Sequence, residues 1–129
     1  MSNIAGRTDA RSVADLLAKT PAALFMAHVA PDADSLGSSL ALALATQSAN
    51  PTARVAVTFG DEPFVTPRIL AALPRLDMLI APHQAVADGP WDVVVTCDVS
   101  SKERLGAGEM AFDSASTTVV IDHHSSNPG

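Results

Sequence analysis

The sequence has little of what several classes of protein need. It contains one cysteine, Cys97, and no tyrosine, and aromatic residues occupy 4% of its 129 positions. A single cysteine cannot form an internal disulfide, which excludes a disulfide-stabilised scaffold and favours a reducing compartment. No apolar run approaches the roughly 20 residues of a membrane-spanning helix, and residues 1–19 lack the apolar core of a signal peptide. We therefore expect a cytoplasmic protein with no membrane partner.

Basic residues are also scarce. Eight lysines and arginines stand against fourteen aspartates and glutamates, which gives a formal net charge of −6. Proteins that bind long nucleic acids through a basic surface have the opposite balance, so no long nucleic acid is predicted as a partner. A small nucleotide substrate remains compatible with this charge, because bound cations reverse the local sign. Hydrophobic residues fill 47% of the chain, and this content predicts one globular domain.

Apolar runs alternate with helical patterns along the chain, as they do in α/β folds with a parallel sheet. Buried strands are expected at 22–28, 54–59, 92–98 and 117–122, with a weaker one at 77–81. Helices are expected at 8–19, 35–48 and 67–73, with one or two short helices in 101–112, whereas 82–90 is expected to be a loop or a single turn. The prediction is an α/β fold with a parallel sheet of about five strands and helices on both faces.

The C-terminal end of the sequence is unusual for this fold class. The chain stops at Gly129, a few residues after the last expected strand, where an α/β unit normally continues into a covering helix. We therefore expect residues 1–129 to be the N-terminal part of a larger enzyme. An uncovered sheet edge and apolar face should also promote self-association, which favours a homodimer.

Three polar clusters follow three of the expected strands. Their members are His28, Asp32, Asp34 and Ser35, then Asp98, and then Asp122, His123 and His124. Ligand sites of doubly wound sheets form at the carboxyl ends of the strands, so we expect these side chains to converge. Carboxylates and imidazoles crowded at one edge would repel one another or take up protons unless divalent cations lay among them. Mixed oxygen and nitrogen ligands suit manganese, zinc or ferrous iron.

Such a site has a defined chemistry. A carboxylate such as that of Asp98 can bridge two ions about 3.5–4 Å apart, and such a pair activates a shared water and holds a phosphate during in-line displacement. The helix expected from Ser35 would point its N-terminus to the same edge, which favours an anionic substrate. These residues therefore support a metal-dependent phosphoesterase.

Each cluster alone also has a simpler explanation. Asp34 or Ser35 would serve as an ordinary N-cap of the helix at 35–48, and Asp98 could cap the short helix that follows it. His28 could be a hydrogen-bonded histidine at a strand end, and residues 122–124 could be a polar turn. One shared site accounts for all the clusters together, whereas the simpler explanations need a coincidence at every strand end. Cys97, inside an apolar strand, is expected to be a buried and unreactive thiol.

The segments HVAPDADS, VVVTCD and VVIDHH resemble the first three motifs of the DHH phosphoesterase superfamily. Within it, CDVSSKERLG and DHHSSNPG are most similar to the branch of nanoRNases, oligoribonucleases that also act on 3′-phosphoadenosine 5′-phosphate. The resemblance implies a two-metal phosphoesterase with Mn²⁺ as the expected ion. Its implied substrates are short oligoribonucleotides and the nucleoside bisphosphate.

The resemblance also implies a role for each motif residue. The implied metal ligands are His28 and Asp32 on one ion, Asp34 and His123 on the other, and Asp98 on both. The implied catalytic residues are His124, at the phosphate, and Asp98, while Asp122 would orient a histidine from behind. The candidate substrate-binding residues are Arg104, Asn127 and Ser35, although Arg104 could equally be an ordinary surface arginine.

Two features of the family have no counterpart in this sequence. These are a fourth motif that supplies a further aspartate and a separate C-terminal domain that binds the substrate. We therefore expect this chain alone to bind metal weakly and to turn over slowly or not at all. Alternatives within the superfamily are a pyrophosphatase, a polyphosphatase or a cyclic-dinucleotide phosphodiesterase. A non-catalytic metal- or nucleotide-binding fragment is the alternative outside the enzymes.

Overall fold

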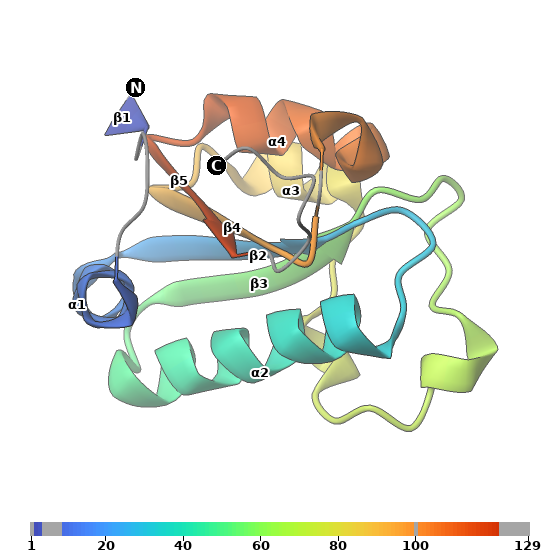
Figure 1. Ribbon diagram of the computed structural model, residues 1–129, viewed down its shortest axis with the longest axis horizontal. Helices are drawn as coiled ribbons and strands as arrows, with labels where there is room; N and C mark the ends of the chain where they lie inside the picture. Colours follow the sequence, from blue (N-terminus) through green and yellow to red (C-terminus); the bar gives the residue numbers. More distant parts are fainter. Residues whose placement is uncertain (1, 4–8, 100, 122–129) are drawn as a thin grey trace.

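The computed structural model describes residues 2–3, 9–99 and 101–121 (Figure 1). Within this part of the chain, five parallel strands form one sheet in the order β1-β5-β4-β2-β3. The strands are β1 (Ser2–Asn3), β2 (Ala22–Ala27), β3 (Arg54–Phe59), β4 (Val93–Cys97) and β5 (Thr117–Ile121). The α-helices are α1 (Ala10–Lys19), α2 (Ala33–Ala49), α3 (Pro82–Asp88) and α4 (Glu109–Ser114). Three 3₁₀ segments complete them: η1 (Arg68–Leu70), η2 (Leu76–Met78) and η3 (Lys102–Gly108).

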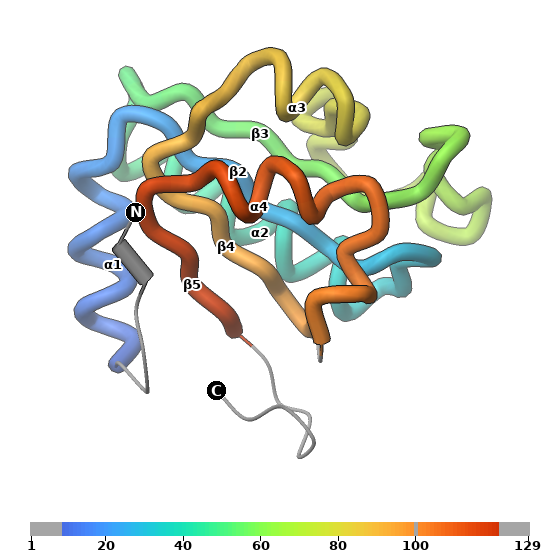
Figure 2. The backbone as a smooth tube through the Cα atoms, turned by 90° about the horizontal axis from the view of Figure 1, so that it is seen from above, coloured from blue at the N-terminus to red at the C-terminus, as the bar shows by residue number. Residues whose placement is uncertain are grey.

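Helices cover both faces of the sheet, as the sequence predicts. The helices α1 and α2 lie on one face, and α3 and α4 lie on the other (Figures 1 and 2). Side chains of a strand alternate between faces, so Phe25 of β2 packs with Leu36 of α2 while Leu24 packs on the opposite side with Trp91. All six residues of β2 are buried, which explains why its sequence is continuously apolar rather than alternating. The predicted α/β fold is confirmed.

The prediction of a strand at 77–81 is wrong. Residues 76–78 form η2, and only Leu79 pairs with β3, through an isolated parallel bridge to Val57. Arg75 adopts a left-handed conformation (φ 60°), and its guanidinium Nε lies 3.0 Å from Asp77 Oδ1, which closes a local turn where the strand was expected. The fifth strand is instead β1, two residues long and paired with β5, which is too short for a pattern of alternation to reveal it.

A helix, α3, occupies residues 82–88 of the segment 82–90, where a loop or a single turn was expected. Pro82 occupies the first turn of α3, a position where its missing N–H costs no hydrogen bond. Behind this helix, the Trp91 indole N–H donates to the Ala85 carbonyl at 2.8 Å. The helix expected at 67–73 is shorter than predicted and consists of the three residues of η1.

No helix in the described ranges is long and apolar enough to cross a membrane.

The segment η3 returns from β4 across the ends of β2 and β3. The Val29 N–H donates to the Arg104 carbonyl at 2.7 Å, and the Ala107 N–H donates to the Gly60 carbonyl at 3.1 Å. This close approach requires glycine at position 60, because a Cβ there would lie 1.8 Å from the Leu105 carbonyl oxygen. The backbone after β4 is thereby fastened to the backbone after β2 and β3.

Gly60→Ala is therefore expected to destabilise the domain. The added methyl group displaces η3 from the strand ends, and the free energy of unfolding should fall by roughly 3 kcal/mol. Gly37→Ala is the matched control, because no atom lies within 4 Å of a Cβ at that position in α2, and it should stabilise by roughly 0.5–1 kcal/mol. Urea unfolding followed by circular dichroism measures both, and equal stabilities for the two variants would contradict this account of η3.

Candidate metal centre

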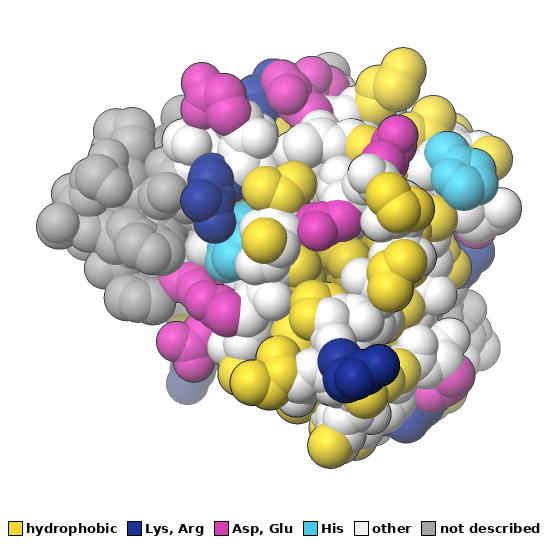
Figure 3. All heavy atoms as spheres, turned by 90° about the vertical axis from the view of Figure 1, so that its right-hand side faces the viewer, with side chains coloured by type: hydrophobic (Ala, Val, Ile, Leu, Met, Phe, Trp, Pro, Cys, Tyr) yellow, Lys and Arg dark blue, Asp and Glu magenta, His cyan; other side chains and the backbone are white. Residues whose placement is uncertain are grey.

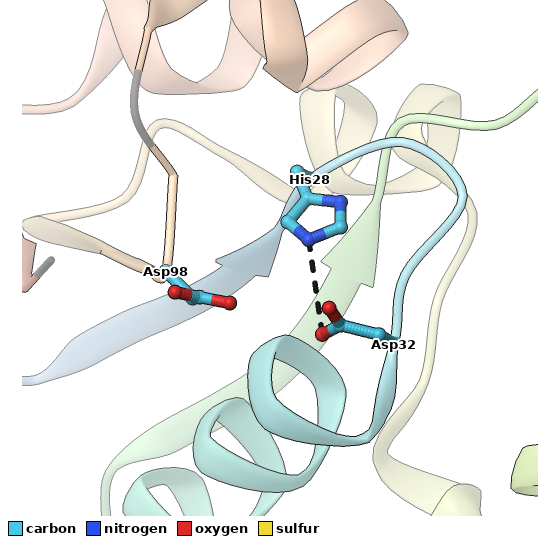
Figure 4. Close-up of side chains that lie close together, drawn as sticks. All are labelled: His28, Asp32 and Asp98. Atoms are coloured by element: carbon cyan, nitrogen blue, oxygen red, sulfur yellow. Dashed lines mark ion pairs between the residues drawn. The ribbon is translucent and has the colours of Figure 1, made fainter. Parts of the chain in front are cut away.

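Three polar side chains converge where β2 and β4 end (Figure 4). His28 follows β2 directly, Asp98 follows β4 directly, and Asp32 precedes α2. β2 and β4 are neighbours, with Met26 of one paired to Thr96 of the other, so the two strands end side by side. One nitrogen or oxygen of each of the three side chains lies within 4.8 Å of the others. The parallel register thus brings together residues that are 70 positions apart in the sequence.

The imidazole of His28 is oriented by the backbone. Its Nδ1 lies 2.6 Å from the Val29 carbonyl oxygen and 3.2 Å from Arg104 Nη2. A carbonyl only accepts hydrogen bonds and a guanidinium only donates them, so the shorter contact favours the ring proton on Nδ1 and the longer one opposes it. The lone pair of Nε2 is then directed to the side where Asp32 Oδ1 lies, 3.8 Å away. A histidine that donates from one ring nitrogen to a carbonyl and offers the other is the usual arrangement of a metal ligand.

Asp32 is the N-cap of α2. The sequence had instead suggested Asp34 or Ser35 as the capping residue. The Ser35 N–H donates to Asp32 Oδ1 at 2.9 Å, and the Asp32 N–H donates to Ser35 Oγ at 3.2 Å, which forms a reciprocal capping box. The Ser35 N–H lowers the pKa of the Asp32 carboxyl below its ordinary value, and the nearby His28 adds to this effect. The side chain is 60% exposed, so an ionised carboxylate faces solvent beside His28.

Asp98 is held in an unusual backbone conformation. Its φ is 61°, in the left-handed region that residues other than glycine seldom adopt. The Asp98 N–H donates to the Ile121 carbonyl at 2.8 Å, so the end of β5 fixes the residue from one side. The carboxylate is half-buried, with Oδ1 shielded from solvent. Strained residues of this kind concentrate at functional sites.

Of the other predicted site residues, the structure describes Asp34, Ser35 and Arg104 and does not describe the rest. Asp34 is exposed in the first turn of α2 and is not part of the three-residue group, while Ser35 is buried with its hydroxyl engaged in the cap. The Arg104 side chain is exposed, yet its Nη2 lies 3.2 Å from His28 Nδ1. The remaining predicted residues, Asp122, His123, His124 and Asn127, lie outside the described residues, and their roles stay predictions.

One residue of this edge was missed from the sequence. Asp61 follows β3 and Gly60, and its carboxylate accepts a hydrogen bond from the Ala30 N–H at 2.8 Å. The same rule that selected Asp98, an acidic residue just after a buried strand, could have found it. On the face of the molecule at the right-hand side of Figure 1, acidic, basic and histidine side chains lie beside hydrophobic side chains (Figure 3).

Comparison with known proteins agrees with the motifs. Residues 23–129 match the DHH family, N-terminal domain. The chain belongs to the DHH family. Its fold is similar to that of an exopolyphosphatase-related protein from Bacteroides fragilis, with a TM-score of 0.73 and 24% sequence identity. That match covers 89% of this chain and 34% of the other, so the DHH chain spans about a third of the length of that protein.

The donors of this DHH domain fit a divalent cation. One imidazole nitrogen and two carboxylates form a mixed nitrogen and oxygen set, which suits manganese and related ions. Ligand atoms on opposite sides of an ion with bonds of about 2.1 Å lie about 4.2 Å apart. The three atoms lie within 4.8 Å of one another, which is close to this span, so these three side chains together could hold one ion.

Asp32 allows its two roles to be separated by substitution. Asparagine caps a helix as well as aspartate does, so Asp32→Asn should leave stability nearly unchanged, whereas Asp32→Ala should lower it by about 1 kcal/mol. Both variants lose the carboxylate, so in both the Mn²⁺ affinity should fall by about 10-fold or more. Urea unfolding and calorimetric titration measure the two effects. Undiminished Mn²⁺ affinity in Asp32→Asn would exclude Asp32 as a ligand.

Cys97 should be chemically silent in the folded DHH domain. Burial raises the pKa of its thiol to about 11, and the side chain is 1% exposed. Because the thiolate is the reactive form, iodoacetamide at about pH 8 should modify the chain only after denaturant is added. Mass spectrometry distinguishes the two states, and rapid labelling of the native protein would show that β4 is not buried as described.

Proposed function

We propose that this DHH domain is the metal-binding part of a phosphoesterase that hydrolyses short oligoribonucleotides and 3′-phosphoadenosine 5′-phosphate. The observation that carries the proposal is the convergence of His28, Asp32 and Asp98 in a chain of the DHH family. The proposed cofactors are two Mn²⁺ ions, of which the described residues would hold one. When bound, such ions supply Lewis-acid stabilisation and a water of lowered pKa.

Each residue has a proposed part in this chemistry. His28 and Asp32 would hold the first ion, and Asp98 would be shared with a second ion to which Asp34 and His123 contribute. His124 would contact the phosphate and Asp122 would orient a histidine. The Nδ1–H bond of His28 to the Val29 carbonyl and the lowered pKa of Asp32 both keep these ligands in the forms that bind cations.

Positive charge beside the centre supports an anionic substrate. The chain carries a net charge of −6, yet the Arg104 guanidinium stands against His28 at this edge. Arginine offers a planar set of donors that matches phosphate oxygens. The amide-rich N-terminus of the 17-residue α2 begins at the same place. We propose that Arg104 binds a substrate phosphate and that a C-terminal domain beyond residues 1–129 selects the nucleotide.

Hydrolysis of polyphosphate is the second candidate. It is favoured by the similarity in fold to the exopolyphosphatase-related protein. The two candidates share the proposed ions and differ in whether the substrate carries a nucleoside. Substrate comparison therefore separates them without altering the proposal for the metal centre.

Metal binding by the chain itself is the first test. Calorimetric titration with Mn²⁺ should show saturable binding that is lost in His28→Ala and in Asp98→Ala. His83→Ala is the control, because this histidine is exposed on α3, outside the three-residue group. Absence of binding in a folded wild-type chain, or equal loss in the control, would contradict a metal centre at this edge.

Activity is the second test, with the chain and with a longer protein that contains it. With Mn²⁺ present, we expect the longer protein to release nucleotide from a short oligoribonucleotide and phosphate from 3′-phosphoadenosine 5′-phosphate, and the chain alone to do so slowly or not at all. Asp98→Asn should lower both rates by at least about 100-fold, because charge stabilisation at the phosphate depends on this residue. Faster release from polyphosphate would favour the second candidate. Unchanged rates in Asp98→Asn would overturn both.

A further inference from the structure

We infer that Asp61 is a positioning residue of the metal centre: its carboxylate holds the loop 28–32 in the conformation that directs His28 and Asp32 towards one ion. The inference rests on the proposed function, in that it assumes this edge binds a cation. Its structural basis is the hydrogen bond from the Ala30 N–H to Asp61 Oδ1, at 2.8 Å. Asp61 itself does not belong to the three-residue group, so it would act through the loop rather than as a ligand.

The loop 28–32 needs an external restraint because its conformation is locally unfavourable. Ala30 has a φ of 50°, in the left-handed region where a Cβ is crowded by the backbone. The next residue is Pro31, and a residue before proline prefers extended backbone. Two local preferences therefore oppose the observed turn. Conformations of this kind persist only where surrounding contacts over-determine them.

The contacts around the loop show what Asp61 adds. Before Ala30, the Val29 N–H is bonded to the Arg104 carbonyl, and after it, Asp32 is fixed by the cap of α2. Pro31 has no N–H to donate. The Ala30 N–H is thus the donor at the apex of the turn, and the acceptor that it meets is a side chain from the end of β3.

Asp61 is itself well placed to act as a fixed support. The preceding residue, Gly60, accepts from the Ala107 N–H and lies directly against the Leu105 carbonyl. The bond from Ala30 therefore ties the loop to the same backbone junction that joins η3 to β3. Release of this bond would let Ala30 relax towards extended backbone. The relaxation would change the separation of His28 Nε2 and Asp32 Oδ1, now 3.8 Å.

Three variants of the 129-residue chain separate this role from charge and from stability. Asp61→Ala removes the acceptor and the charge, Asp61→Asn removes the charge but keeps an oxygen at the same place, and Glu62→Ala removes a neighbouring charge. In calorimetric titration with Mn²⁺, Asp61→Ala should weaken binding by about 10-fold, as the loss of an orienting partner does. Asp61→Asn and Glu62→Ala should bind as the wild type does. Asp61→Ser, whose side chain is one atom shorter, replaces Asp61→Ala if that variant fails to fold.

A second measurement needs no metal. In nitrogen-15 spectra of the metal-free chain, His28 should be the Nδ1–H tautomer in the wild type and in Asp61→Asn. In Asp61→Ala the tautomers should mix, and the Ala30 amide should exchange faster with solvent. A purely structural contribution would lower stability without changing the tautomer, so this readout is specific to positioning.

The outcomes distinguish this inference from the proposed function. If the wild type binds Mn²⁺ and Asp61→Ala binds it equally well, the positioning role is overturned while the metal centre stands. If Asp61→Asn is as weak as Asp61→Ala, the charge of Asp61 acts directly and the inference is overturned. If the wild type binds no Mn²⁺, the proposed function fails, and the tautomer of His28 alone decides whether Asp61 positions the loop.

Discussion

Parallel pairing between β2 and β4 is the constraint on which the rest of this structure depends. The register from Ala23 with Val93 to Met26 with Thr96 ends both strands at the same level, so His28 and Asp98 leave the sheet together. Because both strands are buried on both faces, neither can slip without exposing its apolar side chains. The spacing of the two side chains is therefore fixed by the hydrophobic core rather than by contacts within the site.

Local interactions then orient the side chains that the sheet brings close together. The Val29 carbonyl sets the ring of His28, the cap of α2 sets Asp32, and the end of β5 holds Asp98. Each of these contacts is made by the backbone or by a capping residue, and each leaves the side chain with at least one nitrogen or oxygen that can bind a cation. The same residues can therefore stabilise the fold and bind a ligand, as is common where binding residues lie at the ends of helices and strands.

The sequence predicted the ends of the buried strands better than the connections between them. Residues at strand ends could be found because continuous apolar runs such as 93–97 mark buried strands, and the polar residue that follows each run is conspicuous. The sequence alone could not show whether Asp32 or Asp34 lies beside His28. Only the geometry of the helix cap shows that it is the carboxylate of Asp32. The strand expected at 77–81 is absent because the chain turns at Arg75, which has a φ of 60°, and continues into η2, and apolar spacing does not reveal such a turn. A loop or a single turn was expected at 82–90, whereas α3 begins there with Pro82, a residue that suits the first turn of a helix.

The single bridge between Leu79 and Val57 has a consequence for how the domain behaves in solution. β3 lies at the end of the sheet order, where a bare strand would present its backbone groups to any passing chain. The segment at 79–80 meets that edge, and the Ile80 N–H donates to the Val57 carbonyl at 2.9 Å. It thereby occupies the middle of β3 without extending the sheet. This segment, which is not itself a strand, thereby protects the edge of β3 from pairing with another chain and so from aggregation.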